Sequence, residues 1–125
     1  TLAISLMQLP ELHGEPFNFG PQAQQNNSVL ELVKQMALHW EQVRWNDISG
    51  EIGGPYESGL LRLNCDKALH YLRWHSVMGF EDTVRMTAEW YRAYYQQPAQ
   101  ISAITFSQIV TYTTIAKQQG VAWAQ

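Results

Sequence analysis

Apolar residues recur at helical spacing from the first residues of the chain. Leu2, Leu6 and Leu9 fall on one face of a helix predicted over residues 1–9, and Pro10 ends that helix because proline cannot continue it. The predicted helix begins without an N-cap residue or a methionine, which suggests that the chain is a fragment entered part of the way along a helix.

A second helix is predicted from residue 28. Ser28 and Glu31 form the S-x-x-E capping box, in which each side chain bonds the backbone N–H of the other residue. The apolar positions that follow predict a helix whose buried face consists of Val29, Val33, Met36 and Trp40.

Two further helices are predicted between residues 64 and 94. Asn64 is placed as the N-cap of a helix of about three turns, whose mostly apolar face holds Ala68, Leu69, Leu72 and Trp74. Glu81 and Asp82 open the next helix with the charge that a helix N-terminus favours. Its predicted core-facing stripe, widened by Trp90, consists of Phe80, Val84, Thr87, Tyr91 and Tyr94.

The last part of the chain, residues 96–125, is predicted to be a polar linker followed by a C-terminal helix. Thr105 and Gln108 match a capping box, and the helix is expected to run to Gly120. We interpret this helix as a docking arm or as a contact for another chain.

Three short segments predict strands. Residues 15–20 alternate around Phe17 and Phe19, residues 42–48 alternate polar and apolar side chains, and residues 60–63 are mostly apolar. The first two strands and the helix between them would form a βαβ unit with parallel strands and a right-handed crossover. We therefore expect one domain over residues 1–125, of α+β class, rich in helix and with a small, partly parallel sheet.

A glycine-rich loop is predicted at residues 49–59, which contain four glycines and a proline. Glycine lets the backbone approach a ligand closely, so the loop is a candidate ligand clamp. The alternative is that it is only a long connection.

Composition narrows the classes of function. The net charge is −3, and the eight Lys and Arg residues are scattered singly, so no basic stripe exists for nucleic acid. No apolar run approaches the ~20 residues of a membrane span, and we expect no membrane partner. The one cysteine, Cys65, excludes an internal disulfide and fits a reducing compartment, which suggests a cytoplasmic protein.

Known catalytic and cofactor motifs are absent from the sequence. The four histidines have no metal-ligand spacing, and Cys65, near a helix N-terminus, has no histidine placed by sequence to activate it. We interpret it as a small buried residue. No G-x-G-x-x-G, P-loop, G-x-S-x-G or Tyr-x-x-x-Lys motif occurs. We expect no catalytic, metal-binding or cofactor-binding residue in this chain.

The ordered motifs nevertheless resemble a known family. Residues 61–74 read L-x-L-N-x-x-K-A-x-x-x-L-x-W, and T-A-E-W-Y follows at residues 87–91. This pair resembles the C-terminal end of nucleotide-sugar dehydratases and epimerases of the extended short-chain dehydrogenase/reductase family. F-N-F-G-P at residues 17–21 and P-Y-E at residues 55–57 make the chain most similar to the CDP-glucose 4,6-dehydratases.

The resemblance implies a substrate-binding domain whose Rossmann domain is missing here. In such enzymes, which act as homo-oligomers, bound NAD takes a hydride from C4 of the glucose, water leaves across C5 and C6, and the hydride returns to C6. This chain would hold the CDP-sugar and would be inactive alone.

The resemblance also implies three substrate-binding residues. Tyr56 and Glu57 match a histidine-glutamate or similar polar pair that closes over the nucleotide diphosphate. A tyrosine can stack on the base or bond a phosphate or ribose oxygen. Arg62 either reaches a phosphate or lies in solvent.

Two other functions stay open. The chain is then either a stand-alone dimerisation or protein-interaction module, with its aromatic side chains as the interface, or a fragment of another nucleotide-sugar epimerase or dehydratase that binds a different base.

Overall fold

The structure is a computed structural model that describes residues 2–21, 25–48 and 63–125. Its described residues form α-helices and short 3-10 turns. The helices are α1 (Leu2–Gln8), α2 (Val29–Ala37), α3 (Asp66–Leu72), α4 (Phe80–Gln96) and α5 (Ile101–Gln118). The 3-10 turns are η1 (Pro10–Leu12), η2 (Pro98–Gln100) and η3 (Ala122–Ala124).

The predicted α+β class is wrong. The part of the chain that the structure describes contains helices and no strand, so the expected sheet and the βαβ unit are absent from it. Residues 15–20 and 42–48 were predicted strands, and both are irregular. The third predicted strand, residues 60–63, lies outside the described residues except for Leu63, which is irregular.

A strand needs a backbone partner as well as alternation, and these two segments have none among the described residues. Residues 15–20 are held mainly through their side chains, as when the Asn18 amide donates to the carbonyl of Asn64 at 3.2 Å. Residues 42–48 begin as a turn in which the N–H of Val43 donates to the carbonyl of Trp40. Trp45 and Ile48 are exposed, so the alternation there does not produce a buried face.

Helix α2 begins where the capping box predicts. The Ser28 hydroxyl accepts from the N–H of Glu31 at 3.2 Å, and the Glu31 carboxylate accepts from the N–H of Ser28 at 2.6 Å. The hydrogen bond that the Ser28 N–H donates to the Glu31 carboxylate is the main reason why the pKa of Glu31 is lowered, because it stabilises the charged form. The capping box is therefore confirmed, although Val29, predicted to be buried, is exposed.

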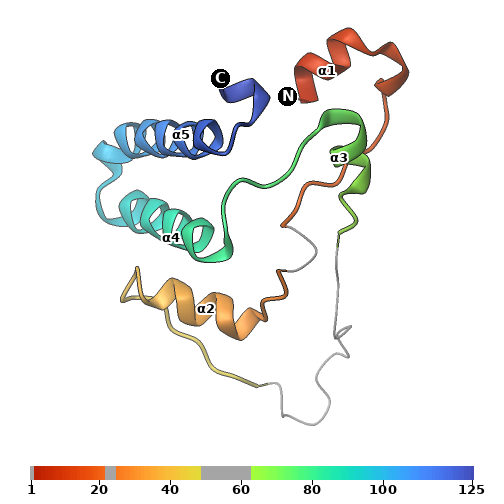
Figure 1. The fold of residues 1–125 in the computed structure, drawn as a ribbon. Coiled ribbons are helices and arrows are strands. Elements are labelled where there is room, and N and C mark those ends of the chain that lie inside the picture. Colours follow the sequence, from red (N-terminus) through yellow and green to blue (C-terminus); the bar gives the residue numbers. More distant parts are fainter. Residues whose placement is uncertain (1, 22–24, 49–62) are drawn as a thin grey trace.

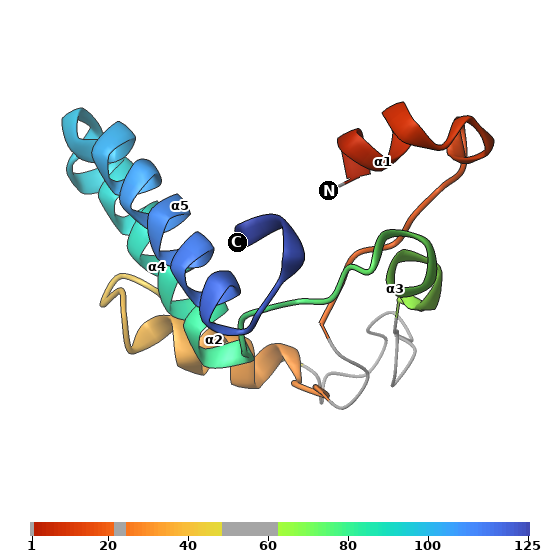
Figure 2. The ribbon, with the colours of Figure 1, turned by 45° about the horizontal axis from the view of Figure 1, so that its top comes forward.

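Helices α2, α4 and α5 form one group, in which α4 packs between the other two (Figures 1 and 2). The Arg92 guanidinium of α4 donates to the carbonyl of His39, just beyond α2, at 2.9 Å. On the other side, the Gln108 amide of α5 donates to the carbonyl of Met86 at 2.7 Å. Because α4 is covered on two sides, its buried residues spread around the helix.

Because α2 and α5 both cover α4, the buried residues of α4 differ from the predicted core-facing stripe. Of its predicted core-facing residues, Val84 is buried and Thr87, Tyr91 and Tyr94 are exposed. The buried side chains of α4 are Val84, Met86, Ala88 and Ala93.

Helix α5 starts five residues earlier than its predicted capping box requires, which would make Phe106 the first helical residue. It begins at Ile101, so Thr105 lies inside the helix and its hydroxyl donates to the carbonyl of Ile101 at 2.8 Å. The C-terminal end at Gly120 is confirmed. Gly120 has a φ of +72°, and the N–H of Val121 donates to the carbonyl of Ala116. These are features of a Schellman motif.

Helices α1 and α3 form a second group, joined to the first by the segment between α3 and α4 (Figures 1 and 2). The centre of this group is a small cluster of three buried side chains, Leu12, Ala68 and Leu72. Helix α3 is about two turns long rather than three. It ends at Arg73, whose φ of +52° is in the left-handed region.

Large hydrophobic side chains are often exposed in this fold. Among the described residues, nine hydrophobic side chains are buried, whereas nineteen large ones are exposed.

Within residues 2–21, 25–48 and 63–125, no helix combines the length and the apolar character needed to cross a membrane.

Candidate functional site

The candidate site is the junction where residues 15–20 pass the start of α3. A turn at Gly14, which has a φ of +80°, directs the segment away from η1, and the N–H of Glu15 donates back to the carbonyl of Leu12. The segment then meets α3 through the bond from Asn18 to Asn64. Two motifs that lie about 45 residues apart in the sequence, F-N-F-G-P and L-x-L-N-x-x-K-A, are thus brought together.

Asn64 has a double role at this junction. Its side-chain oxygen accepts from the N–H of Asp66 at 2.8 Å, which caps the first turn of α3, while its carbonyl oxygen binds Asn18. Asn64 therefore supports the start of α3 with its side chain, but the predicted N-cap is wrong by one residue, because the helix begins at Asp66 and its N-cap is Cys65. A Cβ on Gly20 would lie 3.4 Å from the Cys65 Sγ, so the two segments are in van der Waals contact.

Lys67 places a positive charge at the junction. Its Nζ lies 2.5 Å from the Glu15 carboxylate and 5.0 Å from the ring centroid of Phe17. The side chains of the ion pair are 36% and 49% exposed, so a solute can reach the ammonium. A cation above an aromatic ring, beside a partner that an anionic ligand can replace, is suited to bind phosphate or carboxylate.

Aromatic rings form the neighbouring wall of the site. Phe19 meets Trp74 edge to face with ring centroids 5.0 Å apart, and Phe17 lies 6.5 Å from Phe19. Phe19 and Trp74 also line an open pocket of about 320 Å³, together with Leu2 and Trp123 from the two ends of the described chain. The junction therefore combines aromatic faces, a cation and side-chain amides.

The groups at this junction are of the kinds that bind ligands. In the part of the chain that the structure describes, no group of three His, Cys, Asp or Glu side chains could hold a metal ion. Cys65 is half-buried and its thiol lies 3.7 Å from the carbonyl oxygen of Leu63.

The three predicted substrate-binding residues, Tyr56, Glu57 and Arg62, lie outside the described residues, as does the glycine-rich loop at 49–59. The structure instead draws attention to Lys67, Phe19 and Trp74. Lys67 and Trp74 are the K and the W of the motif L-x-L-N-x-x-K-A-x-x-x-L-x-W at residues 61–74. The sequence therefore marked both residues as part of a motif but indicated no binding role for either. Only the fold reveals that Phe19 lies beside Trp74 and that Phe17 lies beside Lys67.

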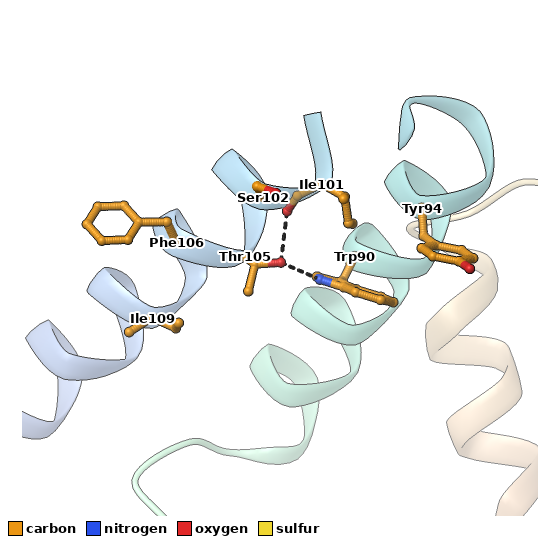
Figure 3. A pocket seen from close by; sticks show the side chains of 7 residues that line it. All are labelled: Trp90, Tyr94, Ile101, Ser102, Thr105, Phe106 and Ile109. Carbon is orange, nitrogen blue, oxygen red and sulfur yellow. Dashed lines mark hydrogen bonds between the residues drawn. The ribbon is translucent and has the colours of Figure 1, made fainter. Parts of the chain in front are cut away.

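A second hollow lies between α4 and α5. It is an open pocket of about 440 Å³, whose lining is mainly apolar and aromatic (Figure 3). Its residues are Trp90, Tyr94, Ile101, Ser102, Thr105, Phe106 and Ile109. The Trp90 ring stacks on Tyr94 with centroids 5.4 Å apart, and its N–H donates to the Thr105 hydroxyl at 2.8 Å.

Comparison with known proteins gives one curated relative. No family model matches the sequence, and no solved structure matches it. The CDP-glucose 4,6-dehydratase of Salmonella typhimurium is 32% identical over 81 residues, which cover 64% of this chain. The chain spans only 22% of the length of that enzyme. It is therefore distantly related to the CDP-glucose 4,6-dehydratases through a part of their length.

Proposed function

We propose that this chain is the C-terminal, substrate-binding part of a nucleotide-sugar 4,6-dehydratase, and that it holds the CDP group of CDP-glucose. The similarity to the Salmonella typhimurium enzyme is the observation that carries the proposal. The match covers 64% of the 125 residues, so a continuous match leaves out about 45 residues at most, counted over the two ends together. It then includes residues 46–80, which contain the glycine-rich loop, Lys67 and Trp74.

The chemistry of the junction supports a nucleotide diphosphate as the ligand. A pyrophosphate would replace Glu15 at Lys67, and an aromatic ring would stack on the base. Tyr56, Glu57 and Arg62 would complete the contacts from the loop that leads into α3. Binding energy from the nucleotide would then position the glucose for reaction.

The redox chemistry would belong to the rest of the parent enzyme. NAD supplies the hydride acceptor in such dehydratases, and the sequence of this chain contains no glycine-rich dinucleotide fingerprint. A Rossmann domain of the parent enzyme would bind the cofactor, and this chain would contribute the nucleotide contacts.

Calorimetric titration with CDP, UDP, GDP and dTDP tests the proposal. We expect CDP to bind most tightly. Lys67→Met should weaken CDP binding about tenfold, because a charged hydrogen bond contributes roughly 1.5 kcal/mol. Lys34→Met, which removes an exposed cation from α2, is the matched control and should leave the affinity unchanged. Equal loss in both variants would refute a specific role for Lys67.

The four titrations also separate the alternatives. Preference for another base would identify a relative of different nucleotide specificity. Binding of none of the four nucleotides would overturn the substrate-binding proposal and favour a protein-interaction module.

A further inference from the structure

Helix α4 carries a run of aromatic rings near its C-terminal end. The Trp90 and Tyr94 rings lie within 12° of parallel with centroids 5.4 Å apart, and Tyr95 meets Tyr94 edge to face at 5.2 Å. Carbon atoms in contact are about 3.5–4.0 Å apart, so a centroid separation of 5.4 Å means that the Trp90 and Tyr94 rings are offset sideways. In Figure 3 both rings are seen edge-on and lie next to each other along α4. Part of each ring face is therefore left uncovered by the other ring.

These rings are open to solvent and continue into the pocket between α4 and α5. Tyr94 and Tyr95 are 50% and 65% exposed. Helix α4 contributes Trp90 and Tyr94 to the pocket, and α5 contributes the remaining lining residues, which include the Ser102 hydroxyl (Figure 3). The volume of about 440 Å³ is within the range of pockets that hold small molecules. An aromatic platform thus lies beside an open groove.

The chain around this platform is uncharged. Residues 93–116, all of which the structure describes, contain no Asp, Glu, Lys, Arg or His. The charged residues of α4 just before them have partners: Arg92 donates to the carbonyl of His39, and Glu89 lies 3.3 Å from Arg85. A phosphate or carboxylate would find no counterion within residues 93–116. The platform therefore suits a neutral ligand.

Neutral hydrogen-bonding groups lie around the rings. Three exposed glutamines are found at the turn between α4 and α5, and these are Gln96, Gln97 and Gln100. Amides and hydroxyls can each donate and accept hydrogen bonds. The Trp90 N–H, by contrast, already donates to the Thr105 hydroxyl at 2.8 Å. Trp90 therefore offers a ligand its ring, while the amides and the Ser102 hydroxyl offer hydrogen bonds.

We propose that this surface binds a neutral carbohydrate chain made of hexopyranose units. One face of such a sugar ring presents C–H groups with partial positive charge, which the negative face of an aromatic ring attracts. The sugar hydroxyls both donate and accept, as the glutamine amides and the Ser102 hydroxyl do. A proline-rich peptide also docks on aromatic grooves, but its prolines offer carbonyl acceptors and no N–H donor. A carbohydrate therefore matches more of this polar surface.

The open shape of the pocket sets the expected strength. Few groups enclose the ligand, so we expect a dissociation constant of about 1 mM. A single aromatic contact changes an affinity by up to about tenfold. Loss of the Tyr94 ring should therefore be measurable, while binding through the remaining rings persists.

Calorimetric titration with maltohexaose and with cellohexaose, up to about 10 mM, tests the proposal. At least one of these neutral oligosaccharides should bind. Tyr94→Ala should weaken its binding about tenfold, whereas Tyr94→Phe, which keeps the ring and removes the hydroxyl, should stay within about threefold of the wild type. Far-UV circular dichroism should show that these exposed substitutions leave the fold intact.

Tyr71→Ala is the matched control, because Tyr71 is also 50% exposed but lies on α3. It should bind the oligosaccharide like the wild type. A wild-type chain that binds neither oligosaccharide, or equal loss in Tyr94→Ala and Tyr71→Ala, overturns the proposal. A Tyr94→Phe variant as weak as Tyr94→Ala refutes stacking on the ring.

Two further measurements separate this surface from other sites and partners. Decaproline that binds where neither oligosaccharide does would overturn the proposal and assign the surface to a peptide. Tyr94→Ala should leave CDP affinity unchanged, and Lys67→Met should leave oligosaccharide affinity unchanged. The outcome is therefore independent of the nucleotide titrations.

Discussion

Leu72→Ala tests whether the small cluster around α3 holds the candidate site together. Leu72 is 5% exposed, and it packs with Leu12 and Ala68 in the centre of the α1–α3 group. Replacing a buried leucine by alanine costs about 2–5 kcal/mol, and the cost is smaller where neighbours can move into the space. The surrounding leucines of α1 and Leu9 are only partly buried, so we expect a loss of about 2–3 kcal/mol in the free energy of unfolding.

Urea unfolding followed by far-UV circular dichroism measures this loss. With a slope of about 2 kcal/mol per molar urea, the midpoint should fall by roughly 1 M. Leu69→Ala is the matched control, because Leu69 lies on the same helix and is 51% exposed. It should cost less than about 0.5 kcal/mol.

Equal midpoints for the two variants would refute the packing described here. Because Leu72 anchors α3, and α3 positions Lys67 against Glu15, Leu72→Ala should also weaken CDP binding, whereas Leu69→Ala should not.

The remaining predictions concern helix ends. Arg73→Gly should stabilise the chain by about 1 kcal/mol in urea unfolding, because Arg73 has a φ of +52° and a left-handed backbone is strained for any residue with a Cβ. Gly120→Ala, at a φ of +72°, should destabilise the chain by a similar amount. If the two variants changed the free energy of unfolding in the same direction, the backbone argument would be wrong. Ser28→Ala should cost about 1 kcal/mol through loss of the α2 cap. Since the pKa of Glu31 is lowered in the folded chain, its contribution is present at neutral pH and lost as pH falls below about 4.3, so the difference between wild type and Glu31→Gln should vanish in acid.

The local sequence determined several helix boundaries. Ser28 and Glu31 start α2 through bonds between residues three apart, and the side chain of Asn64 accepts from the N–H of Asp66, the first residue of α3, two positions away. Gly120 ends α5 because glycine adopts the left-handed backbone of the Schellman motif. These interactions depend only on near neighbours in the chain, so a pattern of residue types suffices to predict them.

The tertiary structure decided what depends on distant partners. Alternation around Phe17 and Phe19 suggested a strand, but a strand requires a second backbone that pairs along its length. The segment is held instead by the Asn18 side chain, which donates to the carbonyl of Asn64, and by the contact of Phe19 with Trp74. The buried face of α4 follows from its packing, because α4 is covered by α2 and α5 at once. The meeting of Lys67 with Glu15 is likewise a consequence of folding, since these residues are 52 positions apart and no local signal joins them.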